Sequence, residues 1–360
     1  MADGSPNSRR ARRHGVLPAV AMLVVLAGGV VLSATNPAAF SGVGRRSLLD
    51  GQWASRYQER YEEALPLRPL GAAVWDLLRY SLFAEGARGV LVGRDGWLFT
   101  AEEFETGRAD GEPLAAQLDR VGELARVLAA RGVALVVVLV PAKARVYPEL
   151  LGRYTLPAAL EGRYEAVRRG LAARGVEAPD LLEPLAKARR RQEVFLRTDT
   201  HWTPYGARVA AQAVAPAVTA ELQRAGSPRA AFTAASGGVR EHRGDLLNFI
   251  RLGPWFEGLG PPPDTVTPIS AVSGQRAELG LFDEILIPVV LAGTSYSAGT
   301  LWSFEDALKA ALQADVLNVA EEGRGPFVPM EALLEGPVLA DLQADVVVWE
   351  IPERYFQPPR

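Results

Sequence analysis

The chain has 360 residues, a formal net charge of −3 at neutral pH, and no cysteine. The lack of cysteine excludes disulfides, cysteine-ligated metal sites and a thiol nucleophile, and it agrees with an oxidising compartment. The negative charge argues against nucleic acid as a partner, because binding to phosphates depends on clustered Lys and Arg.

The amino terminus predicts a membrane anchor. Four arginines between positions 9 and 13 precede an uncharged stretch at 15–34. In a helix about 20 residues cover about 30 Å, which is the thickness of a bilayer core. The arrangement predicts a cytoplasmic tail at 1–14, a single-pass signal anchor in a bacterial inner membrane, and a body in the periplasm. A cleaved signal peptide is the alternative, but Leu32 makes a poor cleavage site before Ala34, which favours an uncleaved anchor.

The rest of the chain divides into an approach segment and one large domain. Residues 35–84 are interpreted as a linker with approach helices near 53–65 and 72–83. Residues 85–360 can enclose one ample core and are interpreted as a single α/β domain. Its Gly- and Pro-rich insertion at about 225–280 has little periodicity, and short strands or a substrate-facing flap are expected there.

Alternating apolar strands and helical patterns within the domain predict a doubly wound parallel sheet with helices on both faces. The first element is a hairpin over 90–99, with Asp95-Gly96 as its turn. A helix over 114–128 follows and leads into the strongly apolar strand 133–140. The further elements expected are a helix over 158–174, a strand over 175–182, a helix over 207–222, and strands over 285–292, 315–320 and 345–352.

The segment Asp199-Thr200-His201 holds one of only three histidines in the chain. A carboxylate that can orient an imidazole ring forms the base half of a nucleophilic triad, which predicts His201 as general base and Asp199 as its orienting group. The alternative is a surface loop in which Asp199 caps the following helix. The other histidines, His14 and His242, lie in the arginine-rich tail and in a polar loop. With one catalytic-looking histidine and no cysteine, neither a metal site nor a cofactor is expected.

A candidate nucleophile, Ser295, follows the predicted strand 285–292. That strand ends abruptly at Gly293-Thr294-Ser295, and a helical pattern comes next. A strand, a tight turn, a serine and a helix expose the hydroxyl at the carboxyl edge of a parallel sheet. The amino terminus of the helix supplies N–H groups for a developing oxyanion. The alternative, a helix-capping serine, is compatible with this role.

Two further loops are expected to converge on Ser295, because the carboxyl ends of parallel strands meet at one edge of the sheet. Gly323 and Arg324 follow the predicted strand 315–320, and Arg354 follows the predicted strand 345–352.

This order of residues resembles the SGNH hydrolases, in the permuted form of the periplasmic alginate O-acetyltransferases and related exopolysaccharide acetylation proteins. Two features match this subfamily: the Asp/His block precedes the serine block, and Pro-Glu-Arg replaces the Asn usual after the third strand. The resemblance covers about 85–356. The tracts that carry it are Gly93–Phe99, Pro141–Arg145, Thr198–Trp202, Gly244–Leu247, Gly293–Ser297 and Trp349–Arg354.

The resemblance implies an O-acetyltransferase that acts on an exported, alginate-like polysaccharide through an acetyl-serine intermediate. A membrane-embedded partner is implied as the source of acetyl groups. The expected oxyanion donors are the Ser295 N–H and a backbone group near Gly323, with Tyr296 beside them. Arg324 and Arg354 are expected to hold a uronate carboxylate, or alternatively to pair with nearby glutamates. A carbohydrate acetylesterase with the same triad, or a non-catalytic scaffold of an export complex, are the alternative functions.

Overall fold

The computed structural model describes residues 23, 24, 27–29, 31, 68–107, 112–273 and 286–356. Most of the predicted span at 15–34 and all of the predicted helix at 53–65 lie outside these residues. None of the helices in the described ranges has the length and apolar character needed to cross a membrane.

The chain divides into two compact units. The first comprises residues 1–79 and 251–259, and the second comprises residues 80–250 and 260–360. The first unit contains most of α3 (Arg68–Phe83), which confirms the helix predicted at 72–83. It also contains α10 (Gly253–Phe256) and the 3-10 turn η6 (Glu257–Leu259). Every candidate site residue lies in the second unit.

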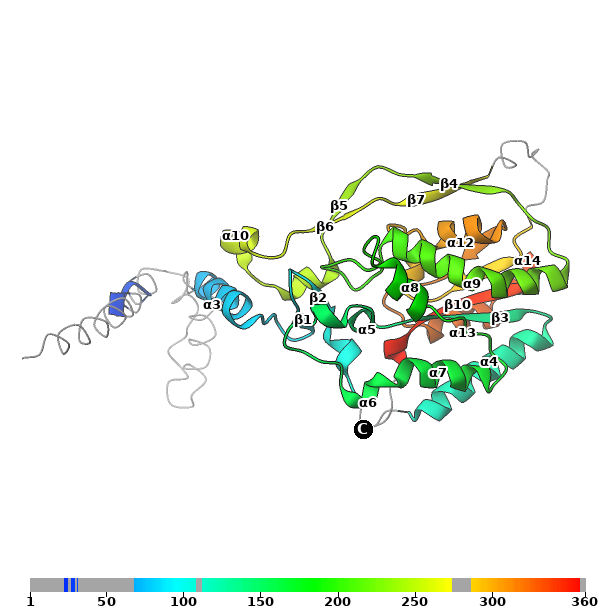
Figure 1. Ribbon diagram of the computed structural model, residues 1–360, viewed down its shortest axis with the longest axis horizontal. Coiled ribbons are helices and arrows are strands. Elements are labelled where there is room, and N and C mark those ends of the chain that lie inside the picture. Colours follow the sequence, from blue (N-terminus) through cyan, green and yellow to red (C-terminus); the bar gives the residue numbers. More distant parts are fainter. Residues whose placement is uncertain are drawn as a thin grey trace, which may run out of the picture. The chain divides into compact units, whose positions relative to one another are not determined.

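A four-stranded parallel sheet forms the centre of the second unit (Figure 1). Its order is β3-β10-β8-β9, with β3 at Ala134–Val140, β10 at Val346–Pro352, β8 at Val289–Ala292 and β9 at Val316–Asn318. Trp349 of β10 stands opposite Val137 of β3 and Ala292 of β8. All seven residues of β10 are buried, as a central strand covered on both faces requires.

Helices cover both faces of this sheet, which confirms the predicted doubly wound α/β fold (Figure 1). Successive side chains of a strand point to opposite faces. Val136 and Val138 accordingly belong to one core cluster, and Val137 belongs to the other. The first face is covered by α8 (Leu182–Ala188), α9 (Pro204–Ala225) and α12 (Phe304–Leu312). The second is covered by α4 (Leu114–Ala130), α7 (Arg163–Ala172), α13 (Phe327–Glu335) and α14 (Val338–Leu342).

The predicted hairpin over 90–99 is confirmed as β1 (Val90–Val92) paired with β2 (Leu98–Thr100). Asp95 and Gly96 both have positive φ, 54° and 77°, as a tight hairpin turn requires. The shorter elements that complete the unit are η3 (Ala101–Phe104), α5 (Lys143–Val146), η4 (Pro148–Leu150), α6 (Ala158–Glu161), η5 (Asp245–Phe249), α11 (Ser295–Ala298) and η8 (Glu353–Tyr355).

The structure corrects two of the predicted elements. The helix expected over 158–174 is interrupted at Gly162 and forms α6 and α7. The strand expected over 175–182 is reduced to one bridge, between Glu177 and Val136. The chain then turns, because the Leu182 amide donates to its near neighbour Asp180 instead of continuing a ladder.

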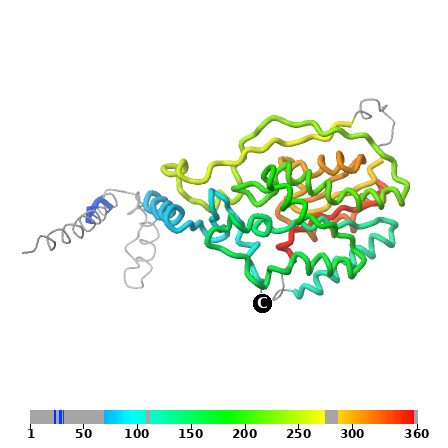
Figure 2. Tube along the Cα trace, in the orientation of Figure 1, coloured from blue at the N-terminus to red at the C-terminus, as the bar shows by residue number. Residues whose placement is uncertain are grey.

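The insertion expected at 225–280 contains two antiparallel ribbons, and its last residues, 274–280, lie outside the described ranges. One ribbon pairs β4 (Phe232–Ser236) with β7 (Ile269–Ser273), and it packs on α12. The other pairs β5 (Arg240–His242) with β6 (Asp264–Val266). Figure 1 shows the two ribbons following one another, with β4 and β7 at the top of the view and β5 and β6 to their left; the same path is visible in the trace of Figure 2.

Candidate active site

The structure brings Ser295, His201 and Asp199 into one hydrogen-bonded chain. The Nε2 atom of His201 lies 2.7 Å from Ser295 Oγ, and its Nδ1 atom lies 2.6 Å from Asp199 Oδ1. Neither alternative from the sequence describes these residues. The cap of α9 is Thr203 and not Asp199, and the cap of α11 is Thr294 and not Ser295.

Asp199 is buried, and its carboxylate accepts hydrogen bonds at both oxygens. Oδ1 accepts from the backbone N–H and the ring of His201, whereas Oδ2 accepts from the Asp245 N–H and the His242 ring. Burial opposes ionisation of Asp199, but the hydrogen bonds from the two histidines outweigh it and hold its pKa well below the usual range. The group that faces His201 is therefore a carboxylate.

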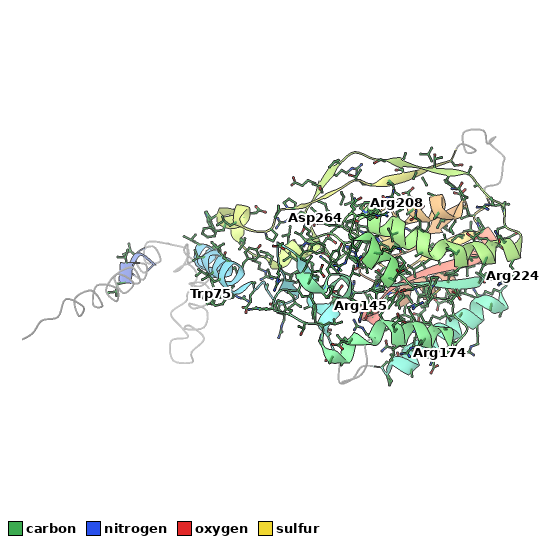
Figure 3. All side chains as sticks on the ribbon, in the orientation of Figure 1. Trp75, Arg145, Arg174, Arg208, Arg224 and Asp264 are labelled. Atoms are coloured by element: carbon green, nitrogen blue, oxygen red, sulfur yellow. The ribbon has the colours of Figure 1, made fainter. Side chains whose placement is uncertain are left out.

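Buried charged side chains fix the backbone of the Asp199 loop. The Lys143 ammonium donates to the carbonyl oxygens of Leu98, Arg197 and Asp199 at 2.6, 3.0 and 3.0 Å. Burial lowers the pKa of Lys143 to about 8. From the other side, Asp264 (labelled in Figure 3) accepts hydrogen bonds from the amides of Arg197 and Thr198.

Aromatic rings enclose the imidazole of His201. The Trp302 ring stacks on it at 4.6 Å between centroids and 11° between planes, and its Nε1 donates to the Ser295 carbonyl at 3.0 Å. Tyr296 contacts the imidazole ring at 4.8 Å. The Tyr296 hydroxyl is buried and donates to the Thr200 carbonyl at 2.7 Å, so it ties the histidine loop to the serine turn.

The turn that carries Ser295 rests on the buried carboxyl of Glu350. The backbone N–H of Thr294 donates to Glu350 at 2.8 Å, and the hydroxyl of Ser297 donates at 3.1 Å. Burial raises the pKa of Glu350 to about 7. Gly293 is required here because a Cβ at this position would lie 2.7 Å from Glu350 Oε2. The sequence identified Glu350 only as a possible partner of an arginine.

Within the described ranges, no hydrogen bond joins either of the two predicted arginines to Ser295. The Arg354 side chain is 10% exposed, pairs with Glu102 at 3.0 Å, and lies over the Tyr296 ring. In the described ranges it therefore pairs with Glu102 and with none of the glutamates expected from the sequence, which were Glu321, Glu322, Glu350 and Glu353. Its burial favours a structural role. Gly323 and Arg324 lie exposed in the turn after β9, and in the described ranges no hydrogen bond or ion pair joins either to Ser295. Their roles as oxyanion donor and carboxylate ligand stay predictions.

Glu353 is instead held by two other arginines. Arg163 and Arg145 (the latter labelled in Figure 3) pair with its Oε1 at 3.1 and 2.6 Å, and its side chain is fully buried. These pairs attach η8 to α5 and α7.

The sequence analysis missed His242. Its Nε2 atom lies 2.8 Å from Asp199 Oδ2, on the oxygen that His201 does not use. The available signal was the scarcity of histidine, since His242 is one of three in the chain. What hid it was distance along the sequence, because only the pairing of β5 with β6 brings it to Asp199.

Asp199, His201 and Asp245 offer ligand atoms within 4.8 Å of one another, which is close enough for a metal ion. Those atoms are occupied by hydrogen bonds, however. Asp199 accepts at both oxygens, and Asp245 Oδ1 accepts from the Thr200 amide at 2.8 Å. The cluster is therefore interpreted as a hydrogen-bonded network, and the absence of a metal stays a prediction.

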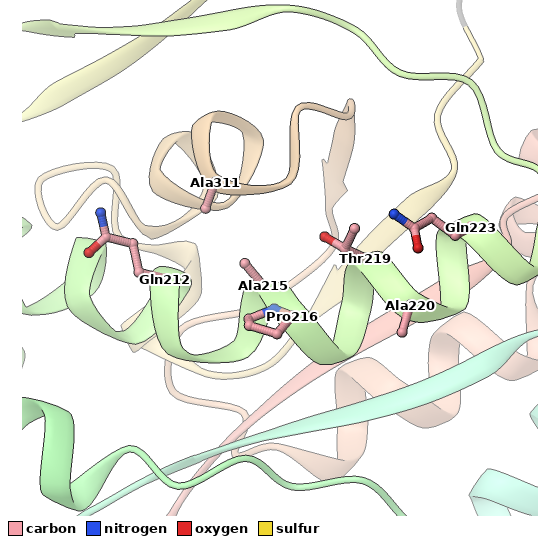
Figure 4. A pocket seen from close by; sticks show the side chains of 7 residues that line it. All are labelled: Gln212, Ala215, Pro216, Thr219, Ala220, Gln223 and Ala311. Carbon is pink, nitrogen blue, oxygen red and sulfur yellow. The ribbon is translucent and has the colours of Figure 1, made fainter.

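A separate hollow lies along the later turns of α9, where Ala311 of α12 faces it (Figure 4). Its lining residues are Gln212, Ala215, Pro216, Thr219, Ala220, Gln223 and Ala311. It contains no ionisable or nucleophilic side chain other than the Thr219 hydroxyl, so this hollow is not a candidate for the chemistry.

Comparisons with known proteins agree with the fold. The family described as "SGNH hydrolase-like domain, acetyltransferase AlgX" matches residues 90–353. The chain is 40% identical over 329 residues to "Probable alginate O-acetylase AlgJ" of Azotobacter vinelandii, covering 90% of this chain and 84% of that protein. It is 40% identical over 344 residues to the protein of the same name from Pseudomonas aeruginosa, covering 93% and 87%.

Solved structures show the same relationship. The O-acetyltransferase domain of Pseudomonas putida AlgJ superimposes with a TM-score of 0.65 at 39% identity, covering 74% of this chain and 92% of that domain. Pseudomonas aeruginosa AlgX, at 23% identity and a TM-score of 0.56, shares the fold. With most of its length matched, the chain belongs to the AlgX family of SGNH hydrolase-like acetyltransferases.

Proposed function

We propose that this chain is an O-acetyltransferase that acetylates an exported, alginate-like polysaccharide through an acetyl-Ser295 intermediate. The observation that carries the proposal is the continuous chain of hydrogen bonds from Ser295 Oγ through His201 to Asp199. An ionised Asp199 accepts the Nδ1–H of His201, so the tautomer with a free Nε2 lone pair faces the serine hydroxyl.

The reaction proceeds in two transfers. In the first, Ser295 Oγ attacks the carbonyl carbon of the acetyl donor while its proton moves to His201 Nε2. The bond to the leaving group then breaks, and the leaving group takes that proton. In the second, a sugar hydroxyl attacks the acetyl-serine and gives its proton to His201. The ester to the sugar forms as the bond between the acetyl carbon and Ser295 Oγ breaks, and Ser295 recovers its hydroxyl proton from His201.

Stabilisation of the tetrahedral intermediates is assigned to the amino terminus of α11. Ser295 is its first residue, and its own N–H is the donor assigned to the oxyanion, because the N–H groups of Tyr296, Ser297 and Ala298 already bond to Thr294. Trp302 supports the imidazolium that forms in each transfer, because its ring face stacks against the His201 ring.

The choice of acceptor and the setting are also proposals. Relatives named alginate O-acetylases support a uronate polymer as acceptor. The arginines and uncharged stretch before residue 35 support an inner-membrane anchor at 15–34 with the body in the periplasm. A membrane-embedded partner would deliver the acetyl groups.

The test compares acceptors. Purified full-length protein receives an activated acetyl ester, with or without deacetylated polymannuronate, and proton NMR of the polymer is compared with acetate release. Transfer predicts new polymer esters that form faster than acetate. Acetate release that is equal with and without polymer, on a polymer that stays bare, would instead identify a carbohydrate acetylesterase. A neutral glucan that accepts acetyl equally well would remove the proposed role of Arg324 as a uronate ligand.

Substitution of the proposed nucleophile is the second test of the proposed function. Ser295→Ala should lose activity by several orders of magnitude, as expected for a triad nucleophile. Ser297→Ala is the matched control, since that hydroxyl bonds to Glu350 and not to His201. Full activity in a well-folded Ser295→Ala protein would contradict the triad and favour a non-catalytic scaffold.

A further inference from the structure

Two imidazoles share the carboxylate of Asp199. His201 Nδ1 lies 2.6 Å from Oδ1, and His242 Nε2 lies 2.8 Å from Oδ2. A triad of Ser295, His201 and Asp199 accounts for the first contact and leaves the second without a role.

The second histidine is held in place by its own set of contacts. His242 ends β5 and pairs in register with Asp264 of β6, whose carboxylate bonds to the amides of the Asp199 loop. Gly244 then lies directly against that loop, because a Cβ there would be 2.1 Å from the Thr198 carbonyl oxygen. The neighbouring Asp245 N–H donates to the same Asp199 oxygen as His242, at 2.9 Å.

One aromatic ring joins the two histidines. The face of Trp302 stacks on His201 at 4.6 Å, and the His242 ring meets it edge-on at 5.2 Å and 78°. His242 is therefore fixed by a strand pair, a hydrogen bond and a ring contact, all directed at the base half of the triad.

We propose that His242 is a positioning residue of the acetyl-transfer site, which fixes the second oxygen of Asp199 and, through its own protonation, sets the base strength of His201. The proposal rests on the proposed function, in which His201 becomes an imidazolium during each transfer.

The electrostatic argument begins with the single negative charge of Asp199. A neutral His242 must carry its proton on Nε2 to donate to Asp199, so its Nδ1 remains available for a second proton. When that proton is bound, the positive charge of His242 compensates Asp199. The carboxylate then stabilises an imidazolium at His201 less well, and His201 is a weaker base.

The surroundings of His242 favour that second proton. The hydrogen bond that His242 donates to Asp199 raises the pKa of His242, and the carboxylates of Asp264 and Asp245 act in the same direction. Burial acts against them but is incomplete, as the His242 side chain is 18% exposed. The Trp302 ring also contacts it, and the charged residues beside it in sequence are Arg240, Glu241 and Arg243.

The experiment compares His242→Ala with His242→Gln in the full-length protein, using hydrolysis of a small activated acetyl ester. Glutamine can place an N–H where the imidazole Nε2–H lies, but it cannot titrate. Alanine should lower kcat by roughly 10- to 100-fold, the usual effect of losing a hydrogen bond to a charged group, with KM nearly unchanged. Glutamine should recover most of that loss.

The measurement that separates this role from a purely structural one is the titration of His201. The chain has only three histidines, so each gives a resolvable ring C2–H signal in NMR. His201 should take up its proton at higher pH in His242→Gln than in the unaltered protein, because no neighbouring cation opposes it. The acid limb of kcat/KM should move to higher pH in the same direction.

Two outcomes would overturn the proposal. The first is an unchanged His201 titration together with an unchanged pH profile in His242→Gln. The second is a folded His242→Gln protein as impaired as His242→Ala, with folding checked by circular dichroism. Failure of the proposed function is detected separately, as activity retained in Ser295→Ala, whereas the NMR titration needs neither the polymer nor turnover.

Discussion

Replacing Glu350 with glutamine should stabilise the protein above neutral pH and leave its stability nearly unchanged in acid. The reason is the uneven use of the two carboxyl oxygens. Oε2 accepts from the Thr294 N–H at 2.8 Å and from the Ser297 hydroxyl at 3.1 Å, whereas the one contact that the structure describes for Oε1 is with the Thr294 hydroxyl, which lies 3.1 Å from Oε1 and 3.0 Å from Oε2. A glutamine can put its oxygen at the first position and its NH2 group at the second, where the threonine hydroxyl accepts. This is also the hydrogen-bonding pattern of a protonated Glu350.

The magnitude follows from the pKa of Glu350, which burial raises from an ordinary 4.5 to about 7. Between these values the folded protein keeps a proton that the unfolded chain has released. Stability is therefore fully present below pH 4.5 and falls as pH rises through about 7. The side chain is fully buried, so the linkage is not reduced by solvent and amounts to about 3 kcal/mol. Glutamine does not titrate and escapes this loss.

The assay is urea unfolding of the unaltered protein and of Glu350→Gln at pH 5 and pH 8. The advantage of the variant should grow between these pH values by about 2–3 kcal/mol. Glu353→Gln is the matched control, because that glutamate is equally buried but binds Arg145 and Arg163. It should destabilise the protein at pH 8, since it leaves two cations without their anion. A Glu350→Gln protein that is less stable than the unaltered protein at pH 8 would refute the reasoning.

Three further predictions concern the scaffold and the anchor. Lys143→Met should lower the free energy of unfolding by roughly 3–5 kcal/mol in urea titration, because three buried carbonyl groups lose a charged donor. Gly293→Ala should fold but lose on the order of 100-fold in kcat, because its Cβ meets Glu350 and displaces the serine turn. Amino-terminal sequencing of the membrane fraction should find residues 15–34 retained, and a chain that starts after them would show cleavage instead.

The hydrogen-bonded arrangement of Ser295, His201 and Asp199 could be predicted from the sequence because its two halves are local patterns. Asp199 and His201 are two residues apart, so one loop brings them together, and a Gly-Thr-Ser turn after an apolar strand places Ser295 at the sheet edge. The strands at 134–140 and 346–352 were predictable for a similar reason, as runs of apolar β-branched residues suit a strand covered on both faces.

The burial of the charged side chains was harder to predict. Arg354 was expected to face a substrate, but the short turn after β10 folds its side chain back over Tyr296. One signal was available and not used. Glu350 lies within a strand expected to be buried on both faces, so its carboxyl had to be hydrogen-bonded or protonated. For His242 the scarcity of histidine was the one signal, and it did not give a location. The position of His242 depends on the pairing of two short strands on either side of a long loop.

Several tracts that carry the family resemblance do no chemistry, and the structure explains their presence in physical terms. Two charged side chains bond to the backbone of the loop before His201. Lys143 donates to the carbonyl oxygens of Arg197 and Asp199, and Asp264 accepts from the amides of Arg197 and Thr198. A cation and an anion thus bond to the same stretch of main chain, and the hydrogen bonds that the structure describes for them do not use the Asp199 carboxylate. Both oxygens of that carboxylate remain available for imidazoles, and this is what allows one aspartate to serve two histidines.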